Sequence, residues 1–149
     1  MSDHQARSVR TAAQARELVE ARGLSHVKVG MFDIDGVMRG KYMQRDKFFA
    51  ALEKGFAFCD VVLGWDSKDE LYDNVAFTGW HTGYPDAPLR IVPESCREVP
   101  FEGDMLLFLA EFEGEAGQLC PRGLLRRVLA RAEALGFAVF GSLEYEFFL

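Results

Sequence analysis

Hydrophobic and polar positions along the chain follow two spacings. An apolar residue at every third or fourth position, the spacing of a helix with one buried face, occurs in three stretches: 11–22, 44–54 and 121–135. Short apolar or alternating runs of strand length occur in six others: 27–32, 38–43, 56–62, 89–92, 105–112 and 142–149. A glycine follows each helical stretch, where glycine commonly ends a helix. The pattern predicts a protein that mixes helices and strands.

The order of these elements narrows the fold class. Asp35 and Gly36 stand between the first two strand runs, and Asp-Gly between apolar runs is a strong hairpin signal. Strand, strand, helix and strand, followed by further strands, is the order of a β-grasp, an α+β fold in which a sheet wraps over one helix. We therefore expect an N-terminal helix within residues 1–23, a β-grasp domain at 24–116, and the first helix and strand of another domain at 117–149.

Three polar stretches lie between or beside these elements. Residues 1–10 are polar and are expected to be frayed. Residues 63–88 show little periodicity and are expected to form a long loop, which in a compact domain is commonly functional or mobile. Residues 113–119 are rich in glycine and acidic side chains, which predicts a turn or linker.

The last strand run places two carboxylates among apolar side chains. Because side chains alternate across a strand, Glu144 and Glu146 would lie on one face, about 6.5–7 Å apart. Two carboxylates that close repel each other unless a cation neutralises them, and Mg²⁺ or Mn²⁺ takes carboxylate oxygens for this purpose. An edge strand with both glutamates in water is the alternative, and on spacing alone it is the more common arrangement.

Composition excludes several classes of function. The chain has 149 residues, of which 49% are hydrophobic, so it can form a globular core. Its net charge of −6 and the absence of a basic run argue against a nucleic-acid partner. No apolar run approaches the length of a membrane span, which predicts no membrane partner. Three widely spaced cysteines without a metal-binding pattern are expected to stay reduced, so we predict a cytoplasmic location.

The segment around Asp33 and Asp35 has two interpretations. An apolar strand followed by D-x-D-G resembles the nucleophile motif of haloacid-dehalogenase-like phosphatases, in which the first Asp attacks phosphorus and Mg²⁺ offsets the charge. The rest of the chain does not support this interpretation, because it lacks the pattern of a parallel sheet with crossover helices. Gly103-Asp104 also lacks a further acid at the spacing of that family's later acidic motif.

The second interpretation involves nearly the whole chain. Five segments resemble, in order, motifs of the glutamine synthetase family: 32–41 its D-x-x-G-x-x-R-G-K hairpin, 83–93 its G-x-x-D-x-x-L-x-x-x-P segment, 97–101 its R-x-x-P-W segment, 120–128 its P-R-x-x-L helix start, and 144–149 its E-x-E-F-F/Y-L strand. Phe101 stands where the family has Trp. Each match alone is weak, but five in the family's order are specific.

The resemblance implies an ATP-dependent ligase of nitrogen metabolism. The family transfers the ATP γ-phosphate to the side chain of glutamate, and ammonia or a primary amine then attacks the γ-glutamyl phosphate. Divalent ions suit such chemistry because they neutralise charge between phosphates and carboxylates. By resemblance, Glu146 would hold the ion near glutamate and Glu144 the ion near the ATP phosphates.

The resemblance also implies a homo-oligomeric ring in which the β-grasp domain of one subunit closes the active site of its neighbour. The family's F-D-G-S-S segment, whose acid helps to bind ammonium, corresponds to 58–62, where Cys59 replaces the Asp. Asp60, one position along, is the candidate substitute, and Asp86 falls on a second acidic position of the same surface. The change makes a larger amine, as in the γ-glutamylpolyamine synthetase branch, an alternative to ammonia.

The remaining ligands, the ATP pocket and the glutamate-binding residues belong in this family to a catalytic domain that these 149 residues do not contain. We therefore expect the chain alone to be inactive and to be the N-terminal part of a longer ligase. A free-standing β-grasp module that binds a partner is the alternative. The apolar run 147–149 favours the first possibility, because an unpaired apolar strand end is prone to association.

Overall fold

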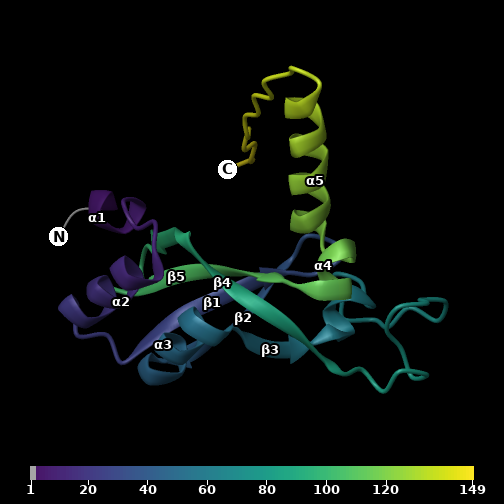
Figure 1. The fold of residues 1–149 in the computed structure, drawn as a ribbon, viewed down its shortest axis with the longest axis horizontal. Helices are drawn as coiled ribbons and strands as arrows, with labels where there is room; N and C mark the ends of the chain where they lie inside the picture. The colour runs from purple at the N-terminus through teal and green to yellow at the C-terminus, as the bar shows by residue number, and fades with distance from the viewer. Residues whose placement is uncertain (1–2) are drawn as a thin grey trace.

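The computed structural model describes residues 3–149, and its centre is a curled sheet of five strands (Figure 1). The strand order is β2-β1-β5-β4-β3. The strands are β1 (His26–Phe32), β2 (Met38–Gln44), β3 (Phe56–Cys59), β4 (Asp86–Glu98) and β5 (Leu106–Phe112). The central pair β1 and β5 is parallel, and the other neighbouring pairs are antiparallel. The predicted mixture of helices and strands is confirmed.

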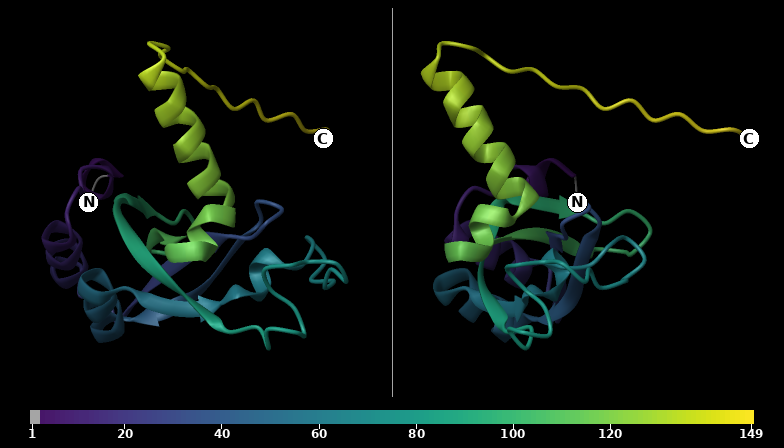
Figure 2. Two further views of the ribbon diagram at one scale, coloured as in Figure 1. Left: turned by 45° about the vertical axis from the view of Figure 1, so that its right-hand side comes forward. Right: turned by 90° about the vertical axis from the view of Figure 1, so that its right-hand side faces the viewer.

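One face of the sheet is covered by α3 (Arg45–Lys54), and α5 (Pro121–Ala134) rises from the opposite face (Figures 1 and 2). The helix α2 (Ala12–Ala21) begins with a capping box in which Thr11 and Gln14 hydrogen-bond each other's backbone N–H groups. It contacts α3 and β4. No helix within residues 3–149 has the length and apolar character needed to cross a lipid bilayer.

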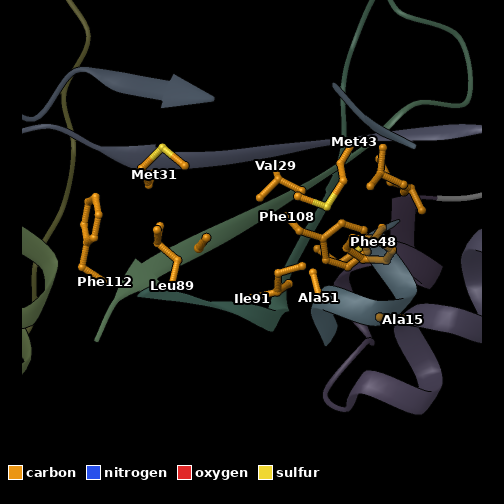
Figure 3. Packing of buried hydrophobic residues seen from close by; sticks show 14 of the residues in the cluster. Ala15, Val29, Met31, Met43, Phe48, Ala51, Leu89, Ile91, Phe108 and Phe112 are labelled. Atoms are coloured by element: carbon orange, nitrogen blue, oxygen red, sulfur yellow. The ribbon is translucent and has the colours of Figure 1, made fainter. Parts of the chain in front are cut away.

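The core lies between α3 and the sheet (Figure 3). Alternate residues of β1 and β5 point toward α3, as the period of a strand requires. The rings of Phe48 from α3 and Phe108 from β5 are both fully buried, with centroids 4.7 Å apart. Phe48 and Phe49 of α3 are buried, whereas Leu52 is only partly buried and packs against this core.

The expectation of a frayed N-terminus is wrong for the residues that the structure describes, and residues 1–2 lie outside them. A short helix, α1 (Asp3–Arg7), is formed, and Ala6 and Val9 are buried. The helix lies against β4. The stretch is polar overall, but two apolar side chains three positions apart are sufficient to dock one turn of helix.

Three predicted elements have different bounds. The strand expected at 56–62 ends at Cys59 and continues as η1 (Asp60–Leu63), a single 3-10 turn. The strand expected at 89–92 extends over the whole of β4, with a register shift between Val92 and Arg97 that bends it along β5. The predicted linker at 113–119 contains α4 (Gly114–Leu119), which packs through the buried Ala116.

The strand expected at 142–149 is not formed. Residues 135–149 contain no helix or strand, and Figure 2 shows this segment extending away from the sheet. A strand is stable only beside another strand that accepts its hydrogen bonds, and the described residues place none next to this segment. An apolar pattern alone therefore does not make it a strand.

Gly55, which ends α3, is expected to tolerate substitution poorly. Its φ is +70°, and a Cβ there would lie 2.5 Å from the carbonyl oxygen of Leu89. Gly36 has a φ of +82° but no atom within 4 Å of such a Cβ, so it is a matched control. We expect Gly55→Ala to lower the free energy of unfolding by about 2–3 kcal/mol and Gly36→Ala by about 1 kcal/mol. Urea unfolding measures both, and equal losses would contradict the steric explanation.

Candidate functional site

The tip of the β1–β2 hairpin is organised around a buried carboxylate. Asp33 is fully buried. Its Oδ1 accepts the backbone N–H groups of Asp35 at 3.1 Å and Val37 at 2.8 Å, and its Oδ2 accepts Nε–H of Arg39 at 2.8 Å. Gly36 takes the positive φ that the turn requires. The predicted hairpin is confirmed, with a turn longer than two residues, because Asp33 N–H bonds the carbonyl of Val37.

The first part of the long loop is docked on this hairpin tip. Asp35 accepts the Ser67 backbone N–H at 2.9 Å, and Arg39 forms an ion pair with Asp69 at 2.6 Å. The guanidinium of Arg39 also lies 5.0 Å from the centre of the Trp65 ring. Residues 65–72 of the predicted loop are therefore held in place by charge and stacking, although an isolated bridge is their only sheet-like pairing.

Tyr72 and Asp66 take part in the same arrangement. Burial together with the nearby Asp35 charge raises the pKa of the Tyr72 hydroxyl. The backbone N–H groups of Glu70 and Lys68 lower the pKa of Asp66, because they stabilise its carboxylate. The pKa of both groups thus moves in the direction that keeps Asp66 charged and Tyr72 neutral at neutral pH.

The two candidate amine-binding acids lie at the same end of the β3–β4 pair but in different environments. Asp60 is 3% exposed, its Oδ1 accepts the Thr78 hydroxyl at 2.5 Å, and its backbone N–H donates to the Pro85 carbonyl at 3.0 Å. Asp86 is exposed and pairs in register with Cys59. Asp60 thus directly follows the residue that pairs with Asp86, so the two acids lie at the same end of the strand pair. Only Asp86 has its side chain in solvent.

The two candidate metal ligands lie in the extended segment after α5. Glu144 and Glu146 are exposed, and neither forms an ion pair or hydrogen bond with another side chain of residues 3–149. Within residues 3–149 there is no group of three or more His, Cys, Asp or Glu side chains placed to hold a metal ion. A metal site at either carboxylate would therefore need ligands from outside the described residues.

A charged cluster on the open face of the sheet was not found from the sequence. Glu111 on β5 is 5% exposed at its side chain and contacts three arginines. Arg90 of β4 lies at 2.7 Å, Arg122 of α5 lies at 3.0 Å, and Arg126 of α5 also contacts it. A lone acid inside the apolar run 106–112 was the available signal, because a buried carboxylate requires a partner.

Burial alone would raise the pKa of Glu111, but hydrogen bonds from Arg126 and Arg122 outweigh it and the pKa is lowered. The groups that face this carboxylate are Arg90, Arg122 and Arg126, and Glu113 lies near by through a 3.9 Å contact with Arg90. Glu111 is thus expected to remain charged in the folded chain at neutral pH.

This arrangement predicts a pH dependence of stability. A carboxylate whose pKa is lower in the folded than in the unfolded chain stabilises the fold above the unfolded pKa, and that contribution is lost as pH falls through the folded pKa. We therefore expect the gap in urea midpoint between the native chain and Glu111→Gln to be widest near pH 7 and to close as the pH falls below the ordinary glutamate pKa of about 4.3. Glu113→Gln is the control, because Glu113 is half exposed, and a gap that does not change with pH would contradict the prediction.

Comparison with known proteins places these features in a family, although no protein-family model matches the chain. The chain is 43% identical over 125 residues to type-1 glutamine synthetase 2 of Dictyostelium discoideum, which covers 82% of this chain and 24% of that protein. It is 36% identical over 141 residues to a glutamate–isopropylamine ligase of Pseudomonas sp, covering 91% of this chain and 30% of the relative. A gamma-glutamylethanolamide synthetase of Streptomyces coelicolor is 30% identical, with coverages of 87% and 29%.

Solved structures agree at the level of the fold. The GmaS–ADP complex superposes with a TM-score of 0.59 and 19% identity, over 81% of this chain and 26% of that one. A Plasmodium falciparum glutamine synthetase gives a TM-score of 0.60 and 14% identity, over 85% and 23%. The chain spans between 24% and 30% of the length of the three relatives described above. On its sequence relatives and its fold together, this chain belongs to the glutamine synthetase family of ligases.

Proposed function

We propose that this chain is the N-terminal part of an ATP-dependent ligase that joins glutamate to ammonia or to a primary amine through a γ-glutamyl phosphate. The observation that carries the proposal is the similarity of 82–91% of the chain to relatives that are named as glutamine synthetase and glutamate–isopropylamine ligase. The chain alone lacks most of an active site and is expected to be inactive. The complete enzyme would work as a homo-oligomeric ring in the cytoplasm.

The division into a β-grasp domain at 24–116 and the start of a catalytic domain at 117–149 belongs to this proposal. Support for the first part comes from the element order, the parallel pair β1 and β5 at the centre, and the packing of α3 on the curled sheet. Support for the second comes from α5, which has apolar side chains at helical spacing and yet contributes no buried residue. An amphipathic helix with an uncovered apolar face is suited to packing against further structure.

In the proposed ligase, Glu144 and Glu146 each contribute a carboxylate to a divalent ion, Mg²⁺ or Mn²⁺. The donor type fits, because these hard ions bind carboxylate oxygens. When bound, such ions neutralise the charge between ATP phosphates and the glutamate carboxylate. The two residues would lie on the same face of the segment if it formed a strand, because they are two positions apart. A neighbouring strand is required for that conformation.

The amine pocket is proposed at the end of the β3–β4 pair, with Asp60 and Asp86 as the acids of this surface. Asp86 is exposed and free to face an ammonium group of a neighbouring subunit's substrate. Asp60 is buried under the loop that carries Thr78, so in the described conformation it orders this surface through that hydroxyl. Cys59 in place of the family's acid, and relatives named for isopropylamine and ethanolamide, favour a primary amine over ammonia.

The phosphatase interpretation has no comparable support. Both oxygens of Asp33 already accept hydrogen bonds from the turn and from Arg39, and the carboxylate is fully buried. A nucleophilic carboxylate must be accessible to its substrate. The contacts give Asp33 a structural role in the hairpin.

The proposal is tested first by the intact mass of the protein expressed from its own gene. A mass well above 16.8 kDa identifies a longer ligase, which is then assayed with glutamate, ATP, Mg²⁺ and a panel that contains ammonia, alkylamines, ethanolamine and polyamines. We expect amine-dependent release of phosphate, with alkylamines used better than ammonia. A mass of 16.8 kDa would overturn the proposal in favour of a free-standing binding module. A longer protein that releases no phosphate with any amine would overturn the proposed ligase activity.

A further inference from the structure

The helix α5 is attached to the body of the molecule by little apolar contact. None of its residues is buried, and Leu124, Leu125, Val128 and Leu129 are each at least 39% exposed. Figure 1 shows the helix rising away from the sheet, with its first turns nearest to β5 and α4. Within residues 3–149 its direction is therefore determined by contacts other than a hydrophobic core.

The contacts at its base are polar and converge on one side chain. Arg122 and Arg126, one helical turn apart, both reach Glu111, and the Arg122 guanidinium also lies 5.9 Å from the centre of the Phe32 ring. Arg127 bonds backward to the carbonyls of Gly117 and Gln118 in α4. The bonds of Arg127 hold α5 to α4, whereas those of Arg122 and Arg126 hold it to the sheet.

The junction between α4 and α5 is short and closely packed. A Cβ at Gly123 would lie 2.2 Å from the carbonyl oxygen of Gly117, so the two helices approach each other at their backbones. Only Cys120 separates α4 from α5. This junction keeps the base of α5 in place against α4.

Glu111 can determine the direction of α5 because its strand is paired on both sides. It lies on β5, which pairs with β1 on one side and with β4 on the other. Its carboxylate is almost completely shielded from water, whereas the three guanidinium groups are partly exposed. If α5 swung away, Glu111 would lose two of its three arginine partners, which is unfavourable for a carboxylate inside an apolar strand.

We infer that Glu111 is a positioning residue that fixes the direction in which α5 leaves the sheet. The carboxylate lies on the central strand of the sheet and acts as an anchor. Arg122 and Arg126, on one face of α5, form ion pairs with it. The segment that carries Glu144 and Glu146 starts where α5 ends, so its starting point depends on this anchor. That last consequence, unlike the orientation itself, rests on the proposed function.

The orientation is measurable by residual dipolar couplings of backbone N–H groups in the full 149-residue chain. In the native chain, couplings from α5 and from the five strands should fit one alignment tensor. In Glu111→Gln, which keeps the side-chain volume but removes the charge, we expect the alignment of α5 to fall about twofold or more relative to the sheet. The sheet couplings report whether the core is still folded.

Two further variants make the outcome decisive. Glu113→Gln makes the same change of charge two positions along, at a half-exposed side chain, and should leave the alignment of α5 at the native value. Arg122→Gln combined with Arg126→Gln removes the anchor from the helix side without altering the buried strand, and should reproduce the effect of Glu111→Gln even if that variant folds poorly. The inference is overturned if α5 keeps the alignment of the sheet in the double variant, or if Glu113→Gln releases it equally.

The measurement needs no glutamate, ATP or amine, so it is independent of the ligase proposal. A fixed α5 in a protein without ligase activity would retain the inference and remove the proposed function. If the ligase is active but α5 does not share the alignment of the sheet in the native chain, the inference fails and the proposed function stands.

Discussion

Replacing Phe108 by alanine is expected to lower the free energy of unfolding by about 3–5 kcal/mol. Phe108 is fully buried in the middle strand of the sheet, and its ring lies 4.7 Å from that of Phe48, centre to centre. Removing the ring deletes apolar contact with α3, the helix that covers this face of the sheet, and leaves a cavity that the neighbouring strands cannot fill. Urea unfolding at neutral pH measures the loss.

The control for this prediction is Phe101→Ala. Phe101 is fully exposed in the turn before β5, so the same chemical change should alter the free energy of unfolding by less than about 0.5 kcal/mol. Similar losses in the two variants would mean that the core is not organised around the contact between α3 and β5.

The second large effect is expected in the complete ligase that we propose. Changing Glu146 to glutamine should lower kcat/KM by about a hundredfold or more, because the loss of even an indirect metal partner costs about 10–100-fold and a direct carboxylate ligand should cost at least as much. Glu144→Gln should act similarly but with its main effect on the KM for ATP. Steady-state kinetics over a range of Mg²⁺ concentrations separates the two, since excess ion should partly restore a site that has lost one ligand.

Glu133→Gln is the matched control, because Glu133 is an exposed acid on α5 outside the E-x-E segment. It should leave kcat/KM and the Mg²⁺ dependence at their native values. An unchanged Mg²⁺ dependence in both Glu144→Gln and Glu146→Gln would remove these residues from the metal sites, without affecting membership of the family.

Elements with strong local signals were predicted well. The hairpin of β1 and β2 followed from alternation and from Asp35-Gly36, and α3 and α5 followed from helical spacing with a glycine or proline at their ends. Elements whose stability comes from contacts were missed or misjudged. The helices α1 and α4 are short and polar, and they are docked on the core by a few buried side chains: Ala6 and Val9 at α1, and Ala116 in α4. No such contact is visible in the local pattern.

For the candidate site as well, the local sequence pattern predicted some features and tertiary contacts decided others. Motif spacing identified Glu144, Glu146, Asp60 and Asp86 as candidates, but it carried no information about exposure. The structure shows that Asp86 is open to solvent and that Asp60 is enclosed by a loop whose Thr78 lies 18 positions along the chain. It also shows that residues 142–149 remain unpaired, because a strand requires a partner that the sequence pattern cannot supply.

The sequence by itself determined the family of this protein and the order of its main elements, because both depend on residue types at short, regular spacings. Only the tertiary structure decided which charges meet. Glu111 is 21, 11 and 15 positions from Arg90, Arg122 and Arg126, and the four side chains meet because β4 pairs with β5 while α4 returns the chain over the open face. Strand register and helix direction are properties of the packed chain, and they place this cluster at the base of α5.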